Sequence, residues 1–96
     1  MKIAMRPSAH VLSRQVSDGA VLIHLETNQV YDLNRTGYRI WQMLQAGSDY
    51  RAIRNCIENE FDVNPDVAAK EISALLDHLA AEHLTEEVQN ADGSAA

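Results

Sequence analysis

Residues 21–41 have the sequence VLIHLETNQVYDLNRTGYRIW, and the hydrophobic period changes within this stretch. The apolar run at 20–25 predicts a strand that is covered on both faces for much of its length. The segment 29–33 alternates in polarity and predicts a second strand, with Tyr31 and Leu33 on one face. From Asn34 the period lengthens to about 3.6 residues, which is typical of a helix. The stretch therefore predicts a hairpin that leads directly into a helix.

A further strand is expected upstream, at about 11–16, where the sequence alternates loosely. Asp18-Gly19 follows it, and this dipeptide favours a two-residue hairpin turn because both central positions need positive φ. Residues 26–28 supply the next turn. The N-terminal half therefore predicts an antiparallel meander of three short strands.

Three helices follow, and each starts at a good N-cap residue: Asn34, then Ser48 or Asp49, then Asn64. Pro65 suits the first helical position. The three apolar stripes consist of Ile40, Trp41 and Leu44; of Ile53, Cys56, Ile57 and Phe61; and of Ala68, Ile72, Leu75, Leu76 and Leu79, with Leu84 near the end. The predicted fold class is α+β, a winged helix-turn-helix with an N-terminal three-stranded antiparallel sheet followed by three helices. This domain spans 10–84, between a flexible N-terminus at 1–9 and a disordered acidic tail at 85–96.

The chain has 96 residues, a net charge of -6 and one cysteine. This length allows one small domain and leaves no room for a separate cofactor-binding domain. A single cysteine forms no intramolecular disulfide, which favours a reducing compartment. The sequence contains neither a signal peptide nor an apolar run long enough for a membrane helix. A cytoplasmic protein that does not bind a membrane is therefore expected.

Charge is unevenly distributed along the chain. Residues 1–54 carry seven Lys or Arg against four Asp or Glu, whereas residues 55–96 carry Lys70 against ten carboxylates. A helix that reads DNA normally presents Arg, Lys, Asn or Gln to bases and basic residues to phosphates. The third predicted helix is therefore unsuited to nucleic acid. The first two predicted helices keep a DNA-binding regulator as the alternative function, through Arg35, Arg39, Arg51 and Arg54.

No catalytic or metal-binding constellation is present in the sequence. Cys56 lies on an apolar stripe, where a thiol packs as a small hydrophobe in the core. His78 and His83 are five residues apart, unlike the i, i+4 pair that chelates zinc on a helix. The sequence holds no glycine-rich phosphate loop and no G-x-S-x-G motif. We therefore expect no enzymatic activity, no metal and no cofactor.

The third predicted strand, 29–33, ends the sheet, and no later strand covers its edge. An unpaired edge is a template for strand addition, which proteins either prevent or use. An extended peptide that paired with this edge would place alternate side chains against the third helix. The pattern alone equally allows an edge that is solvated or shielded by Asp32. Pairing with a second copy, as a homodimer, is also open.

The stretch 21–41 resembles the core signature of PqqD-like proteins. In that family two strands end in Tyr-x-Leu-Asn and lead through Thr-Gly into a helix with an Ile-Trp pair. The corresponding residues here are Tyr31-Asp32-Leu33-Asn34, Thr36-Gly37 and Ile40-Trp41. Phe61-Asp62-Val63-Asn64-Pro65, which precedes a Leu-rich helix, is also similar to the family. The similarity covers roughly residues 10–84.

This resemblance implies a recognition element for ribosomally made precursor peptides, with a winged helix-turn-helix fold and no catalytic activity. Such an element binds the precursor's leader as an added antiparallel strand and partners a separate modifying enzyme. That enzyme is a leader peptidase in lasso-peptide clusters, which the overall similarity slightly favours, or a radical enzyme in the pyrroloquinoline-quinone pathway. By position, the peptide-binding residues are Gln29, Val30, Tyr31, Asp32, Leu33, Ile72, Leu75, Leu76 and Leu79.

Two further expectations concern this peptide-binding set. Leu33 and Leu76 are the members most expected to be purely structural. The acidic third helix and Asp32 predict a leader with at least one Lys or Arg near the site, because opposite charge steers encounter and suppresses wrong partners.

Overall fold

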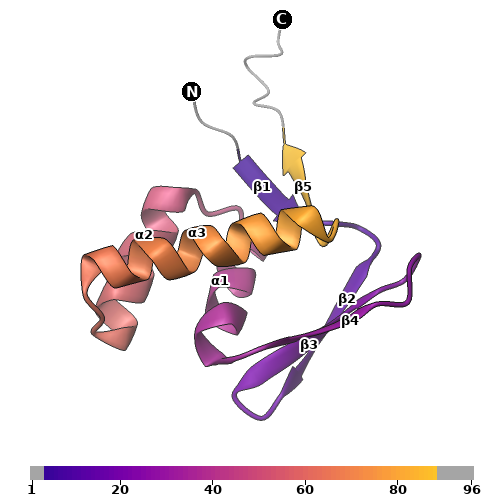
Figure 1. Ribbon diagram of the computed structural model, residues 1–96, viewed down its shortest axis with the longest axis horizontal. Coiled ribbons are helices and arrows are strands. Elements are labelled where there is room, and N and C mark those ends of the chain that lie inside the picture. The colour runs from indigo at the N-terminus through magenta and orange to yellow at the C-terminus, as the bar shows by residue number, and fades with distance from the viewer. Residues whose placement is uncertain (1–3, 89–96) are drawn as a thin grey trace, which may run out of the picture.

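The structure is a computed structural model that describes residues 4–88 (Figure 1). Its elements in chain order are β1 (Ala4–Pro7), β2 (Val11–Val16), β3 (Gly19–His24), β4 (Val30–Leu33), α1 (Arg35–Gln45), α2 (Tyr50–Phe61), α3 (Pro65–Ala81) and β5 (Thr85–Val88). Strands β2, β3 and β4 form an antiparallel sheet in that order, and β1 pairs with β5. The predicted α+β winged helix-turn-helix is therefore confirmed, and a two-stranded sheet is added to it.

The turn between β2 and β3 is shifted by one residue from the prediction. Ser17 and Asp18 form the loop, and Ser17 takes a left-handed φ of 59°. Gly19 is already the first residue of β3 and pairs with Val16. A Cβ atom at Gly19 would overlap with the carbonyl oxygen of Leu33 on β4. The glycine therefore permits close approach of two strands, a role that the dipeptide pattern does not distinguish from a turn.

Strand β3 is buried mainly on one face. Two side chains on its other face, Val21 and Ile23, are half-buried, so the predicted cover on both faces is only partial. The buried face consists of Ala20, Leu22 and His24. His24 is accommodated there because its Nδ1 accepts a hydrogen bond from the backbone N–H of Glu26 at 3.2 Å.

Each helix begins with the predicted kind of cap. The side chains of Asn34, Asp49 and Asn64 accept backbone N–H groups at 2.8, 2.9 and 2.7 Å, and Pro65 starts α3. The helices and the sheet bury one apolar core: Ala20, Leu22, Leu33, Ile40, Trp41, Leu44, Ile53, Ile57, Ala68, Ile72, Leu79 and Leu84. Cys56 was predicted to pack in the core, but it is half-buried and its thiol donates to Glu60 Oε2 at 3.1 Å. None of the helices within residues 4–88 has the length and apolar content needed to cross a bilayer.

Strands β1 and β5 lie in segments that were predicted to be a flexible N-terminus and a disordered tail. Figure 1 shows them side by side above the C-terminal part of α3. Arg6 Nε contacts Glu86 Oε2 at 2.7 Å, and the fully buried Leu84 accepts the N–H of Ser8 at 3.0 Å. Residues 4–7 and 85–88 therefore form strands, which the sequence did not predict. The two segments lie 80 residues apart, and pairing over such a separation leaves no local sequence pattern. The remaining parts of both segments, 1–3 and 89–96, lie outside the described residues.

Candidate functional site

Strand β4 has one paired edge and one free edge. The N–H of His24 donates to the carbonyl of Gln29 at 2.9 Å, and hydrogen-bonded pairs alternate along an antiparallel ladder. The main-chain groups of Tyr31 and Leu33 therefore face β3, whereas those of Val30 and Asp32 face outward. Among the described strands, β4 pairs with β3 alone. The outer edge thus presents two N–H and two C=O groups that an extended chain can pair with.

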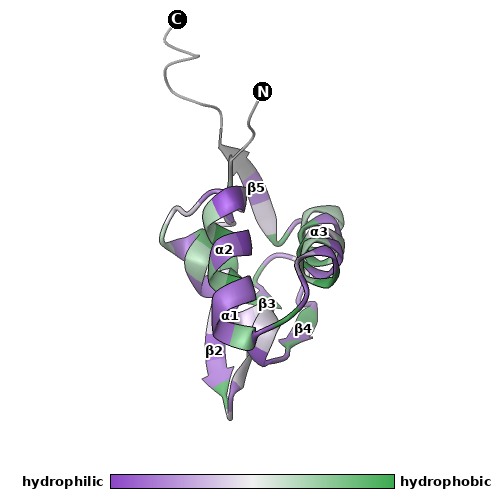
Figure 2. Cartoon of the chain, turned by 90° about the vertical axis from the view of Figure 1, so that its left-hand side faces the viewer, coloured by the Kyte–Doolittle hydropathy of each residue, from purple (hydrophilic) through white to green (hydrophobic). Residues whose placement is uncertain are grey.

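The two faces of β4 differ in burial, as the alternating sequence predicted. Leu33 is 8% exposed and Tyr31 is half-buried, while Val30 is 60% exposed and Asp32 is also exposed. In Figure 2, β4 lies below α3, and β2 lies toward the opposite side of the molecule. The free edge of the sheet therefore belongs to the strand nearest α3.

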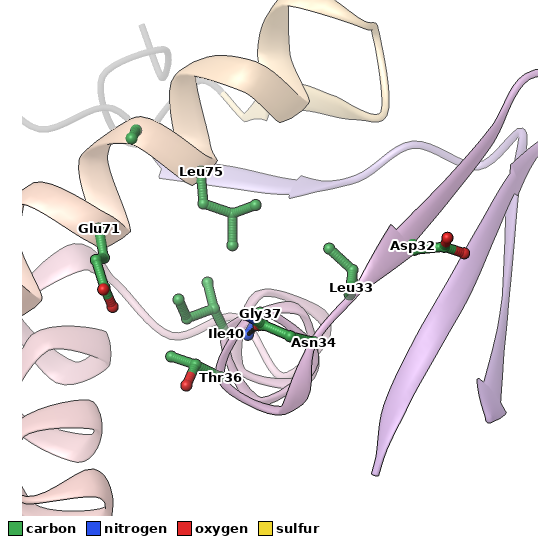
Figure 3. Close-up of a pocket in the computed structure, with 9 residues that line it drawn as sticks. Asp32, Leu33, Asn34, Thr36, Gly37, Ile40, Glu71 and Leu75 are labelled. Carbon is green, nitrogen blue, oxygen red and sulfur yellow. Dashed lines mark hydrogen bonds between the residues drawn. The ribbon is translucent and has the colours of Figure 1, made fainter. Parts of the chain in front are cut away.

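A pocket of about 350 Å³ lies where the end of β4 meets α1 and α3. Figure 3 shows the side chains of Leu33, Ile40 and Leu75 converging on it from these three elements. The carboxylate of Asp32 points away, and the side chain of Glu71 lies on the side farthest from β4. The complete lining is Asp32, Leu33, Asn34, Thr36, Gly37, Ile40, Glu71, Ala74 and Leu75. The pocket is therefore mainly apolar, with one carboxylate side chain at its far side.

Tyr31, on the inward face of β4, contacts the C-terminal half of α3. Its ring meets that of His78 edge-on, with a centroid distance of 5.3 Å and an interplanar angle of 76°. The pKa of its hydroxyl is raised, first by a side-chain hydrogen bond with Glu82, then by desolvation and by the negative charge of Glu82. These contacts tie β4 to α3 beside the pocket.

The structure divides the predicted site residues into two groups. One group lies along the free strand or lines the pocket: Val30, Tyr31, Asp32, Leu33 and Leu75. The other group neither belongs to β4 nor lines the pocket: Ile72 and Leu79, which are 0% and 1% exposed in the core, Leu76, which is half-buried against the core, and Gln29, which is exposed directly before β4. Leu33 was expected to be purely structural, but it is both a core residue and part of the pocket wall.

Sequence reasoning missed most of the pocket wall. Thr36, Gly37 and Ile40 come from α1, and the sequence assigned none of the residues of this helix to the peptide-binding set. On α3, the residues that face β4 and the pocket follow i, i+3, i+4 and i+7 spacing: Glu71, Ala74, Leu75 and His78. The helical spacing of these four residues could have indicated the pocket-facing side of α3. Their mixed polarity makes this spacing harder to recognise than the apolar core stripe of the same helix.

The described chain thus combines a winged helix-turn-helix with a free strand edge next to an apolar pocket. The chain belongs to the PqqD family: the family described as Coenzyme PQQ synthesis protein D (PqqD) matches it over residues 19–84. The resemblance found in the sequence is thereby confirmed. A search of curated proteins found no match.

Two solved structures share this fold. TbiB1 in complex with the TbiA(beta) leader peptide is 31% identical, and the match covers 84% of this chain and 94% of that chain with a TM-score of 0.79. A lasso peptide synthetase B1 complexed with its leader peptide is 23% identical, covers 85% and 96%, and has a TM-score of 0.78. The match to the lasso peptide synthetase B1 establishes a common fold. The match to TbiB1 shows the same fold together with a higher sequence identity.

Proposed function

We propose that this chain is a non-catalytic cytoplasmic recognition protein that binds the leader of a ribosomally synthesised precursor peptide. The leader adds to β4 as an antiparallel strand, and the chain delivers the precursor to a separate enzyme. That enzyme is a leader peptidase with its cyclase, as in lasso-peptide pathways, or a radical enzyme. The observation that carries the proposal is the free edge of β4 beside the pocket, where main-chain pairing and side-chain selection act together. The leader complex of the 31% identical TbiB1 supports it.

The arginines that favour the alternative, a DNA-binding regulator, are largely engaged within the fold. Arg39 donates to both carboxylate oxygens of Glu60 at 3.0 and 3.1 Å, which raises the pKa of Arg39 and lowers that of Glu60. Arg54 pairs within α2, and Arg35 lies 4.8 Å from the ring centroid of Phe61. Paired guanidinium groups contribute less to phosphate neutralisation, so these contacts support peptide recognition over DNA binding.

Proline substitutions on the two edges of the sheet test strand addition. Short peptides selected from a random display library against the wild-type chain serve as labelled probes, and their affinity is measured by fluorescence anisotropy. Val30→Pro and Asp32→Pro each remove an outward N–H of β4, so we expect an affinity loss of at least about 10-fold.

Gln15→Pro is the matched control, because β2 is the opposite edge of the same sheet. The hydrogen bond from Leu25 N–H to the carbonyl of His10, with the β2–β3 register, places the N–H of Gln15 outward as well. The affinity of Gln15→Pro for the peptides should stay within about 2-fold of that of the wild type. Equal affinities for all three variants, with folding confirmed by circular dichroism, would rule out addition at β4. Tight duplex DNA binding that falls steeply with salt would support the alternative.

A further inference from the structure

The register of an added strand determines which of its side chains enters the pocket. Directly opposed residues of an antiparallel pair point to the same face of a sheet. The peptide residue opposite Leu33 therefore points inward, and the side chain of Leu33 itself points toward the pocket (Figure 3). The next inward residue, two positions later in the peptide, lies opposite Tyr31 and near His78. One position of the bound peptide is thus assigned to the pocket.

The chemistry of the pocket suits a long side chain that is apolar along its stem. Leu33, Ile40 and Leu75 supply aliphatic surface from three elements. On the far side from β4 lies Glu71, whose side chain forms no ion pair within residues 4–88. Lys and Arg pack their methylene stems on apolar surface while the charged group reaches a polar partner.

The carboxylates of the pocket lining, Asp32 and Glu71, are not balanced by a cation in that lining. No Lys or Arg is among the lining residues. Arg35, at the start of the α1 wall, lies over the ring of Phe61. Asp32 points away from the pocket, but it adds negative charge beside the incoming strand. A cationic group at Glu71 would therefore meet attraction without a competing cation in the pocket wall.

We propose that the pocket makes the chain select leaders with Lys or Arg at the position opposite Leu33. The alkyl stem lies against Leu33, Ile40 and Leu75, and the cationic nitrogen donates a charge-assisted hydrogen bond to Glu71. The inference rests on the proposed strand addition at β4 and makes Glu71 the residue that determines this specificity. A neutral side chain of similar length would fill the apolar part but leave the carboxylate without its partner.

Parallel selections from one random peptide library test this specificity. The bait proteins are the wild type, Glu71→Lys and Asp77→Lys. Asp77 is the matched control, since it is an exposed carboxylate on α3 outside the pocket lining. Wild type and Asp77→Lys should enrich Lys or Arg at one fixed position of the aligned peptides. Glu71→Lys should enrich Asp or Glu at that same position, because the charge of its partner is reversed.

A pairwise measurement follows the selections. Replacing the enriched Lys of a selected peptide by Met should weaken binding to the wild type by about 3- to 10-fold, and binding to Glu71→Gln hardly at all. The specificity inference is wrong if the selected peptides show no preference for Lys or Arg, or if Glu71→Lys leaves that preference unchanged. Strand addition still stands in that case, provided that the peptides lose affinity for Asp32→Pro. Recovery of no peptides, or of peptides insensitive to Asp32→Pro, overturns strand addition and this inference with it.

Discussion

Tyr31 connects the edge strand to the long helix through two kinds of contact. Its ring packs edge-on against His78, and Glu82, the C-cap residue of α3, raises the pKa of its hydroxyl. His78 lies on the strip of α3 that faces β4, and Glu82 follows directly after the helix. Because an added strand would place a side chain opposite Tyr31, these contacts fix the position of the wall that this side chain meets.

The titration of Tyr31 provides a prediction at this scale. The phenol is neutral below its pKa, and Glu82 raises that pKa above the ordinary value of 10.0. The native state therefore favours the protonated hydroxyl, and its stabilising effect is complete below pH 10.0 and is lost as the pH rises through the raised pKa. Spectroscopic titration of wild type against Tyr31→Phe should show Tyr31 ionising later than an ordinary tyrosine.

Two carboxamide variants separate the cause of this shift from a general charge effect. Glu82→Gln should lower the pKa of Tyr31 toward its ordinary value, because the carboxylate is lost. Glu71→Gln removes a carboxylate from the same helix, next to the pocket, and should leave the titration of Tyr31 nearly unchanged. A Tyr31 pKa that is insensitive to Glu82→Gln would show that the hydroxyl is not held by this residue.

At single positions, sequence patterns identified roles best where one interaction dominates. Asn34, Asp49 and Asn64 were recognised as caps because a cap needs only its own backbone neighbours. Glu71 was counted only among the ten carboxylates of residues 55–96, since its place beside the pocket depends on how α3 packs against α1 and β4. A residue whose role depends on the packing of three elements cannot be recognised from the sequence pattern of its own element.

At the scale of elements, one sheet could be predicted from local sequence patterns and the other could not. The meander of β2, β3 and β4 follows local rules, because short turns connect strands whose alternation is visible in the sequence. The pairing of β1 with β5 depends instead on α3 carrying the chain back beside its beginning. Four-residue strands of mixed composition give no local indication of such a partner.

Hydrogen exchange tests whether this second sheet holds both ends of the described chain. In the full chain, the paired amides of β1 should exchange more slowly than those of exposed loops, although faster than those of β3, because a two-stranded ribbon is only marginally stable. A chain that ends at Leu84 should lose the slow exchange in β1 and keep it in β3 and β4. Identical β1 exchange in the two chains would mean that β5 does not protect β1.

At the scale of the whole molecule, the uneven charge opposes one class of partner and favours another. The net charge is -6, and the carboxylates concentrate in the second half of the chain, which contains α3. In the first half, Arg39 and Arg54 are paired with glutamates. An acidic molecule with engaged arginines repels a polyanionic backbone and attracts a cationic segment over a distance comparable to the Debye length.

The rate of peptide association should therefore depend on salt in a charge-specific way. A selected peptide extended by a short run of Lys should associate roughly 10-fold faster when ionic strength falls from about 0.15 M to about 0.01 M, because the screening length grows from about 8 Å to about 30 Å. Its dissociation rate should change much less, since contacts at β4 govern release. The same peptide extended by Glu should associate more slowly at low salt. Stopped-flow fluorescence measures both rates, and equal salt responses of the two peptides would exclude steering by the overall charge of this protein.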